Sequence, residues 1–216
     1  MQKRLGMLMS VALALLVTTG ALADSMPKSH DGFFLRMGLS LGPASTKLTQ
    51  EVNGRKVGDE FTLSGFSSGY DLMLGGTPAQ GLVIGGLLTA VVTSQPSYGA
   101  SDSSDTINGT MIFAGVGVFA NYYLDPAKGL HFQALLGLGN LDLVASGDPD
   151  SGGRDDKSAS GPFFGGGVGY DFWFSDQWSI GPFGRVVYGV TAFQEPLATT
   201  RANYLYPSVG AAFTFH

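Results

Sequence analysis

The stretch from Met111 to Leu124 constrains the fold of this chain more than any other. Every second side chain along it is apolar, and the residues between them mix glycine, aromatics and one amide. A period of two predicts a β-strand, because successive side chains of a strand point to opposite faces. The run exceeds the roughly 5–6 residues of a usual strand and reaches the roughly 9–11 residues that a tilted strand needs to cross a bilayer. It therefore predicts either a central strand of a soluble sheet or a membrane-spanning strand.

The composition favours a chain built from strands. The 216 residues include 33 glycines, no cysteine and only 13% charged residues. So much glycine is atypical of helical proteins, and no collagen-like period accompanies it. The formal net charge of −5 argues against a nucleic-acid partner, which would require a basic face. Without cysteine, the chain has no disulfide framework and no thiolate chemistry.

The first residues have the pattern of a cleaved secretory signal. A basic pair, Lys3 and Arg4, precedes an apolar run, and an A-x-A cleavage site ends at Ala23. A membrane anchor is the alternative, but the apolar run is too short to span a bilayer. We therefore expect residues 1–23 to be removed, which leaves one domain over 24–216.

Seven further stretches alternate in the same way, which gives eight predicted strands. Long polar segments and short turns alternate strictly between them, as the long extracellular loops and short periplasmic turns of outer-membrane barrels do. We therefore predict an all-β fold, an eight-stranded antiparallel up-and-down transmembrane β-barrel. The predicted strands are 31–42, 63–74, 81–93, 111–124, 130–140, 161–174, 178–192 and 203–215. The predicted long loops are 43–62, 94–110, 144–160 and 193–202.

The two faces of the strands differ in a way that predicts which one meets lipid. A soluble barrel packs its large apolar residues inside. Here one face is almost entirely Leu, Val, Ile, Phe and Tyr, while the other carries glycine, serine, threonine and the mid-strand charges. The interior of an eight-stranded barrel is just wide enough for side chains, so we predict a small and polar lumen inside an apolar wall. The expected polar residues of the lumen are Arg36, Asp71, Asn121, Gln133, Asp171 and Arg185.

Two ion pairs are expected among the charges of the lumen, because an unpaired buried charge would be costly. We predict that Arg36 pairs with Asp71 and that Arg185 pairs with Asp171, since each pair comes from consecutive predicted strands.

Three predicted strands end in related sequences, which indicates a weak internal repeat. Aligning these ends places Tyr70, Tyr122 and Tyr170 on the outer face, at one level beside the short turns. Tyrosine suits a membrane interface because it has an apolar body and a polar tip. We interpret the three as an aromatic girdle; the alternative is the ordinary enrichment of aromatics in strands.

The run from His30 to Gly38 resembles the first strand of the OmpW family, which has a similar aromatic-aromatic-x-Arg-x-Gly pattern. The eight-strand plan and the alternating closing strand are similar to the OmpA/OmpX/OmpW superfamily of small barrels. The resemblance implies the outer membrane of a Gram-negative bacterium, contact with lipid and lipopolysaccharide, and late aromatics, here Phe213 and Phe215, that the assembly machinery recognises. It also implies a non-enzymatic role, either structural or as a narrow pore for small solutes, apolar ones included.

Catalysis is an alternative function, since lipid-A-modifying barrels of the PagL and PagP kinds are enzymes on this scaffold; adhesion through the loops is another. A hydrolase needs a nucleophile with a histidine base in reach. The histidines, His30, His131 and His216, all map to the short-turn end, and none has a serine at a recognisable spacing. Aspartates crowd the loop 144–160 but lack the twelfth-position glutamate of a calcium loop. We therefore expect no enzyme activity, no cofactor, no metal, and a monomer.

Overall fold

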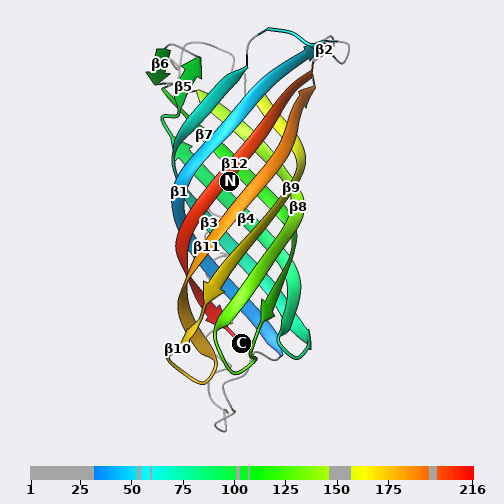
Figure 1. The fold of residues 1–216 in the computed structure, drawn as a ribbon, viewed down its shortest axis with the longest axis vertical. Helices are drawn as coiled ribbons and strands as arrows, with labels where there is room; N and C mark the ends of the chain where they lie inside the picture. The colour runs from blue at the N-terminus through cyan, green and yellow to red at the C-terminus, as the bar shows by residue number, and fades with distance from the viewer. Residues whose placement is uncertain are drawn as a thin grey trace, which may run out of the picture.

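The computed structural model describes residues 32–52, 55–58, 60–100, 103–106, 108–145, 157–194 and 199–216. They form one closed antiparallel barrel (Figure 1). The long strands are β1 (Phe33–Val52), β3 (Phe61–Ala79), β4 (Leu82–Ser94), β7 (Gly109–Tyr123), β8 (Leu130–Ala145), β9 (Lys157–Tyr170), β11 (Trp178–Gln194) and β12 (Thr199–Phe215). The short strands are β2 (Arg55–Lys56), β5 (Ser97–Ala100), β6 (Ser103–Thr106) and β10 (Phe172–Trp173). The predicted signal segment 1–23 lies outside the described residues.

The barrel closes through the first and last strands. Each long strand pairs with its neighbour in sequence, and β1 pairs with both β3 and β12. The ring of eight long strands described here leaves no free edge between them, as a hydrocarbon environment requires. The predicted eight-stranded all-β barrel is confirmed. None of the described residues belongs to a helix long and apolar enough to cross a membrane.

The pairing register fixes how steeply the strands tilt. Stepping across paired residues from Leu35 once around the barrel returns to β1 at Ser45, ten residues further along. With about 3.3 Å per residue and about 4.8 Å between strands, this shear tilts the strands by roughly 41°. Each residue then rises about 2.5 Å along the barrel axis. The 20 residues of β1 span about 50 Å, more than the roughly 30 Å of hydrocarbon, so the barrel projects beyond the membrane.

The strands continue further at the loop end than the sequence predicted. Most of the predicted loop 43–62 belongs to β1 and β3, and the predicted loop 193–202 is partly β11 and β12. Threonine-rich segments suit strands, and outside the membrane the outer wall need not be apolar, so the alternation ends before the pairing does. Strands β5 and β6 form a small hairpin inside the predicted loop 94–110 (Figure 1).

The wall of the barrel is inverted relative to a soluble protein. Large apolar side chains on the outside are exposed, such as Val116 at 59%, Leu138 at 67% and Val209 at 71%. The charged Asp71 and Arg185 are buried inside, at 7% and 4%. This is the predicted arrangement, and it suits a barrel surrounded by lipid.

The lumen is not lined only by small and polar residues, and that prediction was wrong. Its half nearer the loops holds four buried rings, named here the aromatic plug: Phe113, Phe163, Tyr204 and Tyr206. Phe113 stacks on Tyr204 with ring centroids 4.7 Å apart and meets Phe163 edge-on at 5.6 Å. Glycines on neighbouring strands make room for these rings, since a Cβ on Gly137 would lie 2.6 Å from the Phe163 ring. Alternation along one strand cannot show that a neighbouring strand leaves such space.

Candidate functional site

The half of the lumen nearer the short turns contains buried charges and amides beside buried apolar side chains such as Phe34 and Phe119. The structure places all six sequence-predicted lumen side chains inside the barrel, none of them more than 9% exposed. Every strand has an inward position at every second residue, so these six side chains can reach the lumen from different strands. The six are Arg36 on β1, Asp71 on β3, Asn121 on β7, Gln133 on β8, Asp171 between β9 and β10, and Arg185 on β11.

The ion pairs in this region are not the predicted ones. Arg185 Nη2 donates to Asp71 Oδ2 at 2.7 Å. Arg36 Nη1 lies 3.6 Å from Asp171 Oδ1, an ion pair at longer range. Both pairs cross the lumen, so the prediction that each pair joins consecutive strands was wrong. The strand register gives the reason. In the backbone ladder, Arg36 lies opposite Met73 rather than opposite Asp71, and the shear of the barrel brings Asp71 to the same level as Arg185 on the other side of the lumen.

One aromatic ring connects the two ion pairs. The guanidinium carbons of Arg36 and Arg185 each lie 5.4 Å from the ring centroid of Phe183, a distance at which cations are attracted to a ring. The two pairs and this ring are named here the charge column: Asp171, Arg36, Phe183, Arg185 and Asp71. Phe183 was not among the residues predicted from the sequence, although its inward register position beside Arg185 could have suggested it.

His131 and Tyr123 complete the end of the column nearest the turns. Arg36 Nη1 donates to His131 Nε2 at 2.9 Å, and His131 Nδ1 lies 3.0 Å from the carbonyl oxygen of Gly129. A guanidinium only donates and a carbonyl only accepts, so Nδ1 carries the proton and the imidazole is neutral. Tyr123 donates to Asp171 Oδ2 at 2.8 Å. Tyr123 was not among the lumen residues predicted from the sequence, although it shares an inward face with Asn121.

A second polar contact joins Gln133 and Asn121, which face each other across β7 and β8. Gln133 Nε2 donates to Asn121 Oδ1 at 3.1 Å. Several buried polar atoms still lack a partner among the described residues, including Asp71 Oδ1, Asn121 Nδ2, and Nε and Nη1 of Arg185. The larger recesses that the described residues form open on the outer wall instead.

A serine and a histidine meet where the sequence spacing gave no reason to expect it. Ser179 Oγ lies 2.9 Å from His216 Nε2. This contact resembles a nucleophile with its base, but Ser179 is 0% exposed. The His216 ring also packs against Trp173, with centroids 4.5 Å apart. The contact lies within the packed turn end of the lumen.

The aromatic girdle contains two of the three predicted tyrosines. Tyr122 lies next to the last residue of β7 and Tyr170 ends β9, and both are exposed, at 52% and 38%. Tyr70 is the central residue of the 19 in β3, nine residues from Ala79. Its assignment to the girdle was wrong, because β3 continues past the predicted strand end at Leu74.

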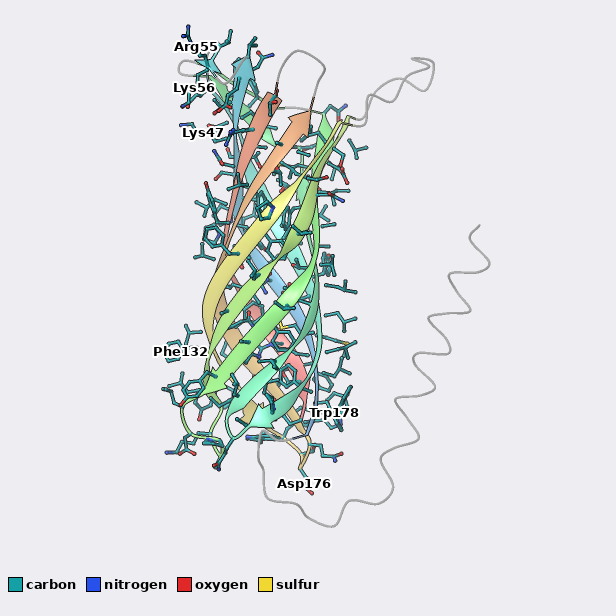
Figure 2. The ribbon with its side chains drawn as sticks, turned by 90° about the vertical axis from the view of Figure 1, so that its right-hand side faces the viewer. Lys47, Arg55, Lys56, Phe132, Asp176 and Trp178 are labelled. Atoms are coloured by element: carbon teal, nitrogen blue, oxygen red, sulfur yellow. The ribbon has the colours of Figure 1, made fainter. Side chains whose placement is uncertain are left out.

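Further aromatics gather at the short-turn end of the barrel. Trp178 projects from the wall there (Figure 2), and its ring centroid lies 4.5 Å from that of Phe213 and 5.0 Å from that of Phe215. Recognition of Phe213 and Phe215 by the assembly machinery stays a prediction.

Charged pairs outside the membrane lie at both ends of the barrel. At the loop end, where Lys47 and Lys56 lie (Figure 2), both lysines donate hydrogen bonds to Glu60 and lower the pKa of Glu60 to about 2. At the turn end, Lys128 lies 3.0 Å from Asp125 and lowers the pKa of that carboxyl. These groups are exposed, and exposed pairs add little to stability.

Within the described ranges, no three side chains of His, Cys, Asp or Glu lie together in a way that could hold a metal ion. The aspartates that suggested a calcium loop, Asp148, Asp150, Asp155 and Asp156, lie outside the described residues.

A closed barrel with an apolar outer wall and charged side chains buried in its interior defines a class, the integral outer-membrane β-barrel proteins of Gram-negative bacteria. Within this class, the chain belongs to the family described as the autotransporter beta-domain, whose family model matches residues 31–194. Its location is therefore the bacterial outer membrane.

The solved structures that are similar to this chain include several outer-membrane proteins. OprG from Pseudomonas aeruginosa is 12% identical, with 88% of this chain and 100% of that chain covered and a TM-score of 0.47. AlkL, solved in lipid bilayers, is 12% identical, with 92% and 97% covered and a TM-score of 0.47. Neisserial surface protein A is 13% identical, with 84% and 96% covered and a TM-score of 0.44. No curated protein matches the chain.

Proposed function

We propose that the protein is a non-enzymatic, structural component of the outer membrane whose barrel is closed to solutes. The observation that carries this proposal is the filling of the lumen at two successive levels. The charge column crosses the half nearer the turns, and the aromatic plug fills the half nearer the loops. An interior only wide enough for side chains has little room for a pathway past both.

The charge column has a structural use that supports this proposal. Both ion pairs join strands that are not neighbours, β1 with the β9–β10 junction and β3 with β11. A slipped register would move one member of a pair to another level and leave a buried charge alone, which costs several kcal/mol. The charge column therefore stabilises one strand register of the closed barrel relative to slipped registers.

Conductance across a planar lipid bilayer tests the proposal. We expect no steady conductance from the wild type, and a measurable one from a Phe113→Ala, Phe163→Ala variant that removes part of the plug. Leu138→Ala, on the outer wall, is the matched control and should stay silent. Steady conductance from the wild type would overturn the closed-barrel proposal.

Narrow passage of small solutes is the second candidate. It is favoured by the buried polar atoms without partners beside the charge column, since such atoms can contact water or a solute. In the same planar bilayers, a pore would give a measurable conductance from the wild type and a larger conductance from the Arg36→Ala variant.

An enzymatic role has a separate test, because Ser179 and His216 are in contact. We expect purified protein in lipid vesicles to release no acyl chain from lipopolysaccharide, as followed by mass spectrometry. Release that Ser179→Ala abolishes would make the barrel a lipid-modifying enzyme. In the structural role, the partners that we propose are outer-membrane lipid, lipopolysaccharide and the assembly machinery.

A further inference from the structure

Three hydroxyl groups interrupt the apolar outer wall that the described residues form. At the loop end, outward polar side chains resume at Asn140 and Ser160, which face each other across β8 and β9. This level is named here the loop-end rim. Between the rim and the aromatics at the turn end, the described outer wall carries three polar side chains: Ser68, Tyr70 and Tyr188.

Only one of these three hydroxyls reaches a partner. Tyr188 donates to Asn203 Oδ1 at 3.3 Å, close to the loop-end rim. Ser68 and Tyr70, neighbours on the outer face of β3, have no hydrogen-bond partner among the described residues. Tyr70 is 51% exposed, so its hydroxyl would face hydrocarbon.

The depth of Tyr70 keeps its hydroxyl away from water. Tyr70 is the central residue of β3 and pairs with Leu39 and Ala90. The next outward polar residue above Ser68 is Ser64, which lies about 15 Å from Tyr70 along the axis. A tyrosine side chain is much shorter than this distance. A hydroxyl without a partner in hydrocarbon is costly, so this position calls for a partner from another molecule.

Tyr70 also stands between two recesses of the wall. One has a volume of about 720 Å³ and includes Leu72, Leu88 and Ala90 in its lining. The other, of about 360 Å³, includes Ser68 in its lining. Leu39, Tyr70 and Ala211 border both. The Tyr70 side chain forms a ridge beside each recess, and a second copy of the same surface can match this shape.

We propose that this face of β12, β1, β3 and β4 binds a second copy of the chain, related by a two-fold axis along the membrane normal. Two copies inserted in the same direction carry Tyr70 at the same depth in the membrane. The Tyr70 side chain of each copy can therefore enter a recess beside Tyr70 of the other copy. The hydroxyls of Ser68 and Tyr70 then pair across the interface, while the small Ala90 and Ala211 allow close approach. A lipid acyl chain fits the recess but has no hydrogen-bonding group at this depth. The proposal departs from the monomer expected from the sequence and does not depend on the proposed function.

Cysteine cross-linking in lipid vesicles tests the contact, because the chain has no cysteine of its own. We expect the S68C variant to form a disulfide-linked dimer on mild oxidation. The matched control is A134C, in an outer recess of about 530 Å³ whose lining has no hydroxyl, and it should stay monomeric. Equal cross-linking of the two variants, or none from S68C, would overturn the proposal and leave lipid as the occupant.

The strength of the association gives an independent readout. Energy transfer between labelled copies in vesicles measures the dissociation constant of the dimer. Tyr70→Phe should raise this constant by about three- to thirty-fold, the range expected for a polar contact within a membrane. Tyr188→Phe is the matched control and should leave it unchanged, since Tyr188 already has a partner in its own chain. A Tyr70→Phe constant equal to that of the wild type would also overturn the proposal.

Discussion

Replacing Asp71 with alanine would leave the Arg185 guanidinium buried without its counter-ion. The two side chains are only 2% and 1% exposed, and they meet at 2.7 Å. Removing one member of a buried pair destabilises proteins by about 3–5 kcal/mol, because the remaining charge is uncompensated. We therefore expect Asp71→Ala to lower the free energy of unfolding by about 3–5 kcal/mol.

Second-site variants show whether the cross-lumen pairing is correct. Adding Arg185→Met to Asp71→Ala should restore most of the lost stability, because replacing a whole buried pair by apolar residues is often neutral. Adding Arg36→Met instead should give no rescue, since Arg36 pairs with Asp171. Urea unfolding of the protein in lipid vesicles, followed by tryptophan fluorescence, measures each free energy. Rescue by Arg36→Met alone would refute the pairing, and a loss below about 1 kcal/mol would refute the reasoning about buried charge.

Three further predictions follow from packing, pH and assembly. Gly137→Ala should destabilise the barrel by about 1–3 kcal/mol in the same urea assay, because its Cβ would meet the carbonyl oxygen of Val116 and lie 2.6 Å from the Phe163 ring. Adding Phe163→Leu should return only the part of the loss that the ring causes, and an unchanged stability of Gly137→Ala would contradict the packing. Hydrogen bonds from lysines lower the pKa of Glu60 in the folded state to about 2. The ionised Glu60 therefore contributes fully to stability above its unfolded pKa of roughly 4.3, and this contribution is lost as the pH falls toward the folded pKa. A carboxyl titration by NMR should show this low midpoint, and Lys47→Ala should raise it; a midpoint of the wild type near the unfolded value would contradict the contact. Phe215→Ala should slow insertion into membranes that contain the assembly machinery, measured by the rate at which protease resistance appears, with Phe172→Ala as the control.

The alternation of side chains predicted most of the architecture. Met111–Leu124 alternates over its whole length, and its apolar side chains, such as Val116, face outward. A period of two is a local property of each strand, so strand number, direction and the face toward lipid could be predicted from the sequence. Strand ends were less predictable, because pairing continues beyond the membrane, where the outer wall no longer has to be apolar.

The members of the charge column could be predicted, but their pairing could not. Arg36 and Asp71 lie on adjacent strands, yet the register offsets them and each finds a partner across the lumen. Likewise, the place of Tyr70 at the centre of the wall depends on how far β3 continues past Leu74.

The sequence by itself therefore determined that this chain forms an eight-stranded barrel with an apolar wall and charges inside. The tertiary structure alone decided which charges meet, which rings fill the lumen and how deep each tyrosine lies. The physical reason is the shear of ten residues around the barrel. This shear arises from all eight pairings together, and it sets the level at which side chains from distant strands face one another.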